Sequence, residues 1–151
     1  MLLSIWQPLR MLRGKKSARF FAEIRRANFE GSRSLALASA RAGVRRFVYI
    51  SSVHVNGQHT SNRPFTEDDA VNPTSVYALS KWETEQLLFS ISKETGMEVV
   101  VLRPPLVYGP GVKGNFRKLI SAISRGFPLP LGCVNSLRSI VFVGNLADAI
   151  L

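Results

Sequence analysis

The chain of 151 residues contains a single cysteine, Cys133, and no apolar run near the roughly 20 residues that a transmembrane helix needs. One cysteine excludes an internal disulfide and is typical of a reducing compartment, so we expect a cytoplasmic protein without a membrane partner. The two histidines, His54 and His59, have no Cys or His partners at ligand spacing, so we expect no metal site.

Acidic residues are also scarce, and the imbalance lies at the start of the chain. Residues 1–46 hold 11 basic and two acidic residues, whereas residues 47–151 hold nine and eight. Such a start can indicate nucleic-acid binding or an organelle transit peptide. We interpret residues 1–18 instead as the product of a shifted reading frame or misplaced start, joined to a domain at 19–151. A solvated basic helix and a genuine targeting or binding arm remain alternatives, and no nucleic-acid partner is expected.

The sequence does contain a tyrosine followed by a lysine four residues later, Tyr77 and Lys81. Positions i and i+4 share one helix face, so the phenol and the ammonium would point into the same space. A nearby cation favours phenolate and lowers the pKa of the tyrosine, which would make the pair a general acid and base for a hydroxyl proton. The pair alone is a weak motif, and its value depends on the flanking segments.

Two apolar, β-rich runs flank this helix, at residues 46–51 and 98–103. The first ends in Ser51 and Ser52, and the second runs into Pro104, which cannot donate to a strand ladder. Open α/β sheets bind their ligands at the carboxyl ends of the strands. The sequence therefore predicts an α/β core with two parallel strands, polar groups at one sheet edge, and helices near residues 28–43, 75–94 and 115–126.

Together with the run from Leu102 to Pro110 and the tail from Arg138 to Ile150, these motifs resemble the extended short-chain dehydrogenase/reductases. Within them the chain looks most like the NAD-dependent epimerase/dehydratase family, in the UDP-glucose 4-epimerase group. The resemblance covers about residues 20–151. It implies a partial Rossmann-like, doubly wound parallel sheet, a nucleotide-sugar substrate, and NAD as the cofactor, with NADP as an alternative.

The resemblance also implies roles for the matching polar residues. Ser52, which lies five residues before Gly57, would hydrogen-bond the reacting sugar oxygen, whereas Ser51 is expected to satisfy backbone groups at the strand end. Tyr77 would be the acid/base. Lys81 would hold the cofactor ribose and tune Tyr77.

Three further residues are implied in binding. Pro104 would pack near the nicotinamide, and Asn115 would contact the substrate. Arg138 falls where the family places an arginine on the substrate diphosphate, a group that a guanidinium pairs with through two parallel hydrogen bonds. The alternative for Arg138 is an ordinary exposed arginine.

Two parts of the family pattern are missing. No G-x-G-x-x-G or G-x-x-G-x-x-G motif occurs in residues 1–46, although a dinucleotide-binding fold uses such a turn to hold the pyrophosphate. At the other end, residues 145–151 have the pattern of a helix without a terminus. We expect an internal fragment that lacks the glycine-rich βα unit and the carboxyl-terminal substrate region.

The reaction class is narrowed by two positions. The related 4,6-dehydratases carry an acidic pair where this chain has Val53 and His54, which argues against dehydration. Many UDP-sugar epimerases have asparagine in place of Leu106, so the substrate pose stays open. We expect reversible hydride transfer at a sugar carbon by an epimerase. A 4-keto-sugar-nucleotide reductase and a catalytically inactive remnant remain alternatives.

A helical wheel of the segment with Tyr77 places Leu79, Trp82 and Phe89 away from the stripe that faces the sheet. Two large aromatic side chains would be costly to leave in water, so either another domain of the chain or a second subunit is expected to cover them. Members of the resembled family commonly dimerise through this helix. We therefore predict a homodimer through a Trp82/Phe89 stripe.

Overall fold

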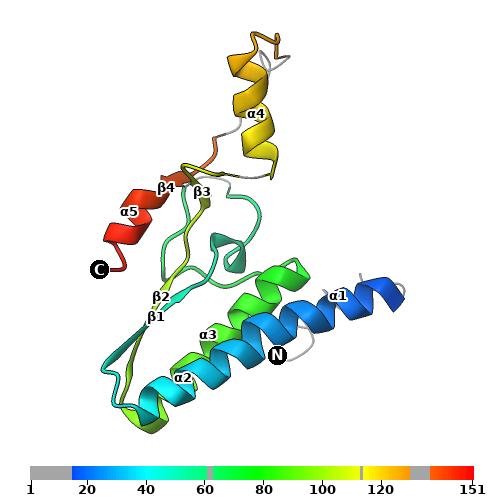
Figure 1. Cartoon of the computed structure of the whole chain (residues 1–151). Coiled ribbons are helices and arrows are strands. Elements are labelled where there is room, and N and C mark those ends of the chain that lie inside the picture. Colours follow the sequence, from blue (N-terminus) through cyan, green and yellow to red (C-terminus); the bar gives the residue numbers. More distant parts are fainter. Residues whose placement is uncertain (1–14, 61–62, 113, 130–136) are drawn as a thin grey trace. The chain divides into compact units, whose positions relative to one another are not determined.

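The computed structural model describes residues 15–60, 63–112, 114–129 and 137–151 (Figure 1). The chain divides into two compact units, residues 1–103 and 104–151. The described residues form an α/β structure with short pairs of parallel strands. The sequence predicts this class and the parallel pairing of the first two strands. No helix in these ranges is long and apolar enough to cross a membrane. The predicted division at residue 18 stays a prediction, and residues 1–14 lie outside the described ranges.

Within its described residues, the first unit contains three longer helices, two short helical turns and two strands. In chain order they are α1 (Lys15–Arg25), the π-helix η2 (Arg26–Glu30), α2 (Gly31–Arg41), β1 (Arg46–Ile50), the 3-10 turn η3 (Val53–Val55), α3 (Val76–Thr95) and β2 (Glu98–Leu102). The helix predicted near residues 28–43 begins further upstream, because no glycine or proline interrupts the chain between Lys15 and Glu30. Arg25, Glu30 and Gly31 all have right-handed helical backbone angles, so α1, η2 and α2 form one continuous segment.

Helix α3 carries the Tyr77–Lys81 pair and confirms the helix predicted at residues 75–94. The hydroxyl of Ser75 caps it by accepting from the backbone N–H of Ala78 at 3.1 Å. At the other end Gly96 adopts φ +75°, the left-handed conformation that closes many helices and that favours glycine. Two local signals therefore fix the length of the helix.

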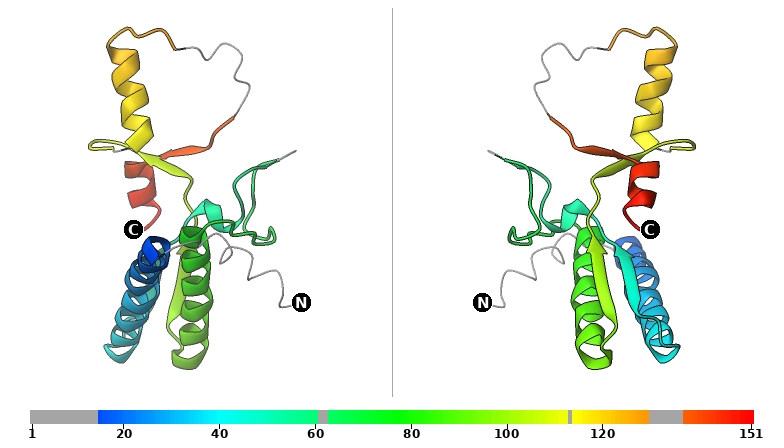
Figure 2. Two further views of the ribbon diagram at one scale, coloured as in Figure 1. Left: turned by 90° about the vertical axis from the view of Figure 1, so that its right-hand side faces the viewer. Right: turned by 90° about the vertical axis from the view of Figure 1, so that its left-hand side faces the viewer.

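Strands β1 and β2 pair in parallel, with Tyr49 opposite Val101 and Phe47 opposite Val99. These four side chains share one face of the pair, because alternate residues of a strand point the same way. Helices α2 and α3 lie side by side in Figures 1 and 2, and both pack on this face. The buried core here consists of Ala36, Tyr49, Leu88, Ile91 and Met97.

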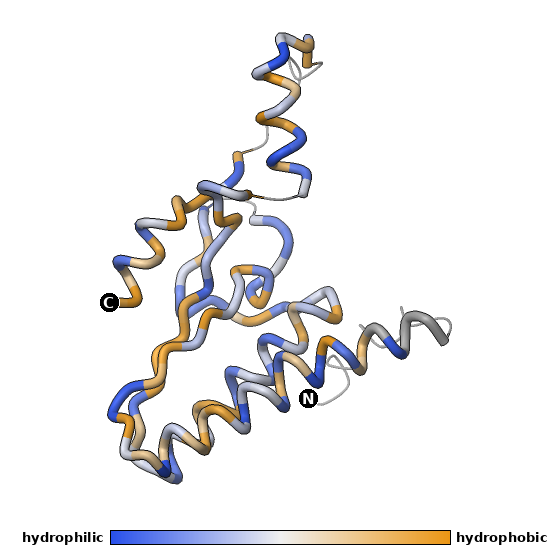
Figure 3. Tube along the Cα trace, viewed as in Figure 1, coloured by the Kyte–Doolittle hydropathy of each residue, from blue (hydrophilic) through white to orange (hydrophobic). Residues whose placement is uncertain are grey.

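The apolar core is visible as hydrophobic positions where β1, β2 and the helices meet (Figure 3). Leu88 is fully buried in it, whereas its neighbour Phe89 is 40% exposed. We expect Leu88→Ala to lower the free energy of unfolding by about 2–5 kcal/mol, because it removes methyl groups and leaves a cavity. Phe89→Ala is the matched control and should cost well under half of that in urea denaturation. Equal losses would contradict the burial assigned to the two residues.

The second unit contains β3 (Leu106–Tyr108), α4 (Gly114–Ser124), β4 (Ile140–Phe142) and α5 (Val143–Asp148). Helix α4 agrees with the helix predicted near residues 115–126, and α5 agrees with the start of a helix predicted in the tail. Strands β3 and β4 pair in parallel, and the sequence did not predict either as a strand. The ring of Tyr108 lies between those of Phe116 and Phe142, with centroid distances of 5.9 and 5.6 Å.

Candidate functional site

The carboxyl end of β1 leads directly into a serine pair and then into η3. Ser52 caps this short turn, and its hydroxyl oxygen accepts from the backbone N–H of His54 at 3.3 Å. Because a hydroxyl has one donor and two acceptor positions, this contact leaves the O–H of Ser52 able to donate elsewhere. The turn that Ser52 caps packs against α3, the helix of Tyr77 and Lys81.

Ser51 differs from the sequence-based expectation. Its backbone N–H donates to the carbonyl of Leu102 at 2.7 Å, which continues the β1–β2 ladder. Its side-chain hydroxyl is buried, however, and has no hydrogen-bond partner among the described residues. The prediction that this hydroxyl satisfies backbone groups is therefore wrong. The backbone N–H of Ser51, and not its hydroxyl, pairs with the carbonyl of Leu102 at the strand end.

Tyr77 and Lys81 lie on one side of α3, as their spacing predicts. Tyr77 is 43% exposed, so its phenol is accessible from solvent. The ammonium of Lys81 lies 5.9 Å from the centroid of the Tyr77 ring and 4.8 Å from that of the Tyr49 ring. It also donates to the carbonyl of Ile50 at 2.9 Å. Lys81 is thereby anchored at the carboxyl end of β1.

The pKa values of the pair follow from partial burial. Burial raises the pKa of Tyr77 above its usual value. Burial also lowers the pKa of Lys81, and the negative charge of Glu85 opposes that change. The expected lowering of the Tyr77 pKa by Lys81 is not seen in this structure, in which desolvation raises that pKa.

Several contacts to α3 were not foreseen from the sequence. Asn28, within the π-helix η2, donates its side-chain N–H to the hydroxyl of Ser80 at 3.0 Å, and Ser80 in turn donates to the carbonyl of Tyr77 at 2.8 Å. Tyr49 provides the aromatic face beside Lys81. The alternation of β1 could have placed Tyr49 on the helix-facing side, but nothing in the sequence pairs Asn28 with Ser80, 52 residues away.

The three remaining predicted site residues all belong to the second unit. Pro104 is half-buried and follows Arg103 directly. Asn115 is exposed in the first turn of α4, and Arg138 is exposed just before β4. Their roles in cofactor or substrate binding stay predictions.

The second apolar face of α3 is covered in part by the chain itself. Leu79 is buried at 3% exposure, and α2 and η2 pack on α3 in addition to the sheet. Trp82 is half-buried and Phe89 is exposed, in agreement with a second apolar stripe.

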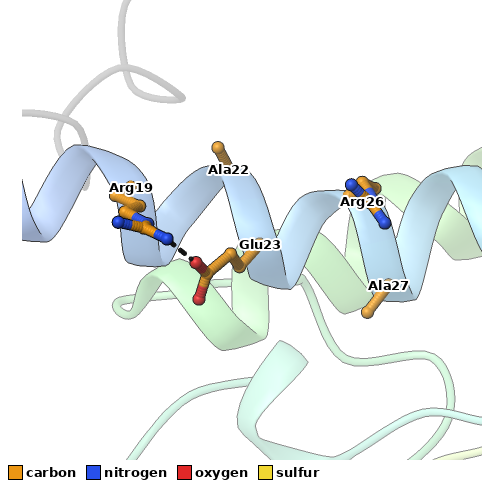
Figure 4. A pocket seen from close by; sticks show the side chains of 5 residues that line it. All are labelled: Arg19, Ala22, Glu23, Arg26 and Ala27. Carbon is orange, nitrogen blue, oxygen red and sulfur yellow. Dashed lines mark hydrogen bonds and ion pairs between the residues drawn. The ribbon is translucent and has the colours of Figure 1, made fainter.

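A hollow elsewhere on the first unit is lined by none of the candidate catalytic residues. It is lined by Arg19, Ala22, Glu23, Arg26 and Ala27, all from α1 and η2 (Figure 4). Arg19 and Glu23 pair with each other at 3.2 Å, and both side chains are largely exposed. An exposed ion pair one helical turn apart contributes little and does not require a ligand.

Comparison with known proteins places these features in a family. The sequence pattern of the "NAD dependent epimerase/dehydratase family" matches residues 15–151. The chain belongs to this family.

A curated relative and two solved structures are informative. The chain is 44% identical over 128 residues to UDP-glucose 4-epimerase of Vibrio cholerae, covering 83% of this chain and 39% of that protein. It superposes on UDP-glucose 4-epimerase of Thermotoga maritima, solved with UDP-glucose, with a TM-score of 0.74 and 26% identity, covering 98% of this chain and 47% of that one. It also superposes on MoeE5, solved with UDP-glucose and NAD, with a TM-score of 0.67 and 32% identity, covering 82% and 42%.

The family assignment confirms the resemblance inferred from the Ser–Tyr–Lys order. The fold matches part of the epimerase Rossmann fold. The chain spans less than half the length of each of these relatives.

Proposed function

We propose that this chain is the catalytic segment of an NAD-dependent sugar-nucleotide epimerase that acts by reversible hydride transfer at a sugar carbon. The observation that carries the proposal is the anchoring of Lys81 on the carbonyl of Ile50, beside the accessible phenol of Tyr77. Ser52 follows the same strand end by two residues, with its O–H available. Support also comes from the likeness to UDP-glucose 4-epimerase of V. cholerae.

The chemistry assigned to the chain is proton transfer and orientation. Bound NAD would supply the acceptor and donor of the hydride. Tyr77 would take the proton of the sugar hydroxyl as its carbon is oxidised and return it when the carbonyl is reduced. Ser52 would donate a hydrogen bond to the same oxygen. The positive charge of Lys81 would favour the phenolate form of Tyr77, which accepts this proton.

The residues present fit one end of the cofactor. An ammonium with three donors, as on Lys81, suits the hydroxyls of a ribose, and half-buried Pro104 offers an apolar surface for a nicotinamide. Residues 1–46 contain no glycine-rich turn to hold the pyrophosphate. The proposal therefore assigns Tyr77, Lys81 and Pro104 to the nicotinamide and ribose, with NADP as an alternative cofactor.

We propose a nucleotide sugar as the substrate. Arg138 would pair with its diphosphate, and Asn115 would contact it through the side-chain amide. Both residues are exposed in the second unit, so both side chains are accessible.

The epimerase and reductase alternatives differ in their electron balance. We would transplant residues 15–151 into V. cholerae UDP-glucose 4-epimerase in place of the matching segment, and assay the chimera. An epimerase interconverts UDP-glucose and UDP-galactose without net change in NADH. A 4-keto-sugar-nucleotide reductase consumes one NADH for each product formed, and only with a keto substrate. A chimera that binds NAD and shows neither activity would favour the inactive remnant.

A homodimer through α3 is also proposed for the intact enzyme, on the Trp82/Phe89 stripe. We expect Trp82→Glu to shift the enzyme from dimer to monomer in sedimentation velocity, because a charge would be buried without a partner. Lys93→Glu, on the exposed last turn of the same helix, is the control and should leave the dimer intact. An unchanged Trp82→Glu dimer would place the interface elsewhere.

A further inference from the structure

A largely buried ion pair joins α3 to the residue that follows β2. Glu85, in the middle of α3, has no exposed surface. Both of its carboxylate oxygens accept from Arg103, the first residue after β2, from Nε at 3.1 Å and from Nη2 at 2.6 Å. This two-point geometry fixes the guanidinium relative to the helix.

The third arm of Arg103 reaches the turn after Ser52. Its Nη1 donates to the side-chain oxygen of Asn56 at 3.1 Å, and Asn56 is 5% exposed. The side-chain N–H of Asn56 donates in turn to the carbonyl of Asp69 at 3.3 Å. One guanidinium therefore joins α3, the end of β2 and the turn that Ser52 caps.

Stability alone does not account for this cluster. A buried ion pair loses much of its attraction to the desolvation of both charges, and apolar residues of similar volume often stabilise a protein as well or better. The charged cluster instead fixes the relative orientation of its side chains, because each hydrogen bond has a defined geometry. Two of the three segments that it joins, α3 and the turn after β1, carry Tyr77, Lys81 and Ser52.

Glu85 also follows Lys81 by four residues, the spacing at which a helical lysine and glutamate pair. In this structure both oxygens of Glu85 are engaged by Arg103, and Lys81 donates to Ile50 instead. Lys81 is held at the strand end by its own hydrogen bond to Ile50.

We infer that Glu85, Arg103 and Asn56 form a positioning cluster, which holds the Ser52 turn against the helix of Tyr77 and Lys81. None of the three is a catalytic residue. The inference rests on the proposed function for its catalytic consequence, whereas the geometry of the turn can be tested without any activity.

The structural test compares two variants of similar size at Asn56 in the 151-residue chain by amide hydrogen exchange. Asn56→Leu removes the acceptor that faces Arg103, and Asn56→Asp retains it. The reporters are the amides of Val55 and Asn56 (or its replacement), which bond to the carbonyls of Ser52 and Val53 at 3.0 Å. Asn56→Leu should raise their exchange roughly tenfold and leave the core amides of α3 within about twofold. Asn56→Asp should restore protection.

Glu98→Gln is the matched control, since it breaks an ion pair with Arg46 in which both side chains are about half exposed. It should leave the exchange of the Ser52 turn unchanged. Unchanged exchange in Asn56→Leu, or an equal rise throughout α3, would overturn the inference. So would a failure of Asn56→Asp to restore protection.

The catalytic consequence is read in the V. cholerae chimera. Asn56→Leu should lower kcat roughly tenfold or more with KM nearly unchanged, because binding residues stay in place while the reacting groups lose alignment. Asn56→Asp should recover kcat. An unchanged kcat in Asn56→Leu would overturn the positioning role. If the parent chimera is inactive, the proposed function fails, and the exchange experiment still decides whether the cluster holds the turn.

Discussion

Replacement of Tyr77 by phenylalanine is expected to lower kcat about 10²–10⁴-fold, the range typical for loss of a general acid/base. The change removes only the phenolic oxygen, and the half-exposed ring can stay in place on α3. In calorimetry, the NAD affinity of the Tyr77→Phe chimera should therefore remain close to that of the parent chimera. The loss should appear in kcat and kcat/KM alike, because the proton is transferred only during the reaction.

Tyr108→Phe is the matched control for this experiment. It makes the same chemical change in a ring that packs between Phe116 and Phe142 in the second unit. We expect its turnover to stay within about twofold of the parent, since no proton transfer is assigned to it. Parent-like turnover in Tyr77→Phe would remove Tyr77 from the mechanism.

Lys81→Met is expected to weaken both cofactor binding and turnover. The side chain has a similar length, but it loses the ammonium that would hold the ribose and stabilise the phenolate. We expect NAD affinity to fall roughly tenfold or more, a loss of about 1.4 kcal/mol, together with a large loss in kcat. Calorimetry and steady-state kinetics on the same preparation separate the two effects.

Lys93→Met, in the exposed last turn of α3, is the control for Lys81→Met. It should leave NAD affinity and turnover unchanged. A Lys81→Met variant with parent-like NAD affinity would show that Lys81 does not contact the cofactor, whatever its effect on kcat.

The parts of the fold that sequence predicted well are those with strong local signals. The Tyr77 helix has a serine cap at Ser75 and a glycine terminus at Gly96, and both caps form. The strands at residues 46–50 and 98–102 are short runs of β-branched and aromatic residues, and they pair in parallel as expected. In each case the signal and the structure it causes lie within a few residues of each other.

The parts that were missed depend on contacts between distant segments. Leu79 is buried within the chain, and a wheel of one helix cannot show which segment covers it. The three-residue strands β3 and β4 are too short to display an alternating pattern, and each forms only by pairing with the other. The link between Arg103 and Asn56 spans 47 residues, so no spacing rule connects them.

In the candidate site, too, the features that depend on local sequence were predicted and those that depend on distant segments were not. Tyr77 and Lys81 are four residues apart, so their shared face follows from helix geometry alone. The anchoring of Lys81 on Ile50 and beside Tyr49 required the three-dimensional fold, and so did the raised rather than lowered pKa of Tyr77.

The central claim is that this segment supplies the acid/base chemistry of a sugar-nucleotide epimerase. The most direct measurement is the interconversion of UDP-galactose and UDP-glucose by the V. cholerae chimera that carries residues 15–151. The account predicts turnover by the chimera and its loss in the Tyr77→Phe version. A chimera that folds and binds NAD but does not interconvert the two sugars, or one in which Tyr77→Phe is equally active, would contradict it.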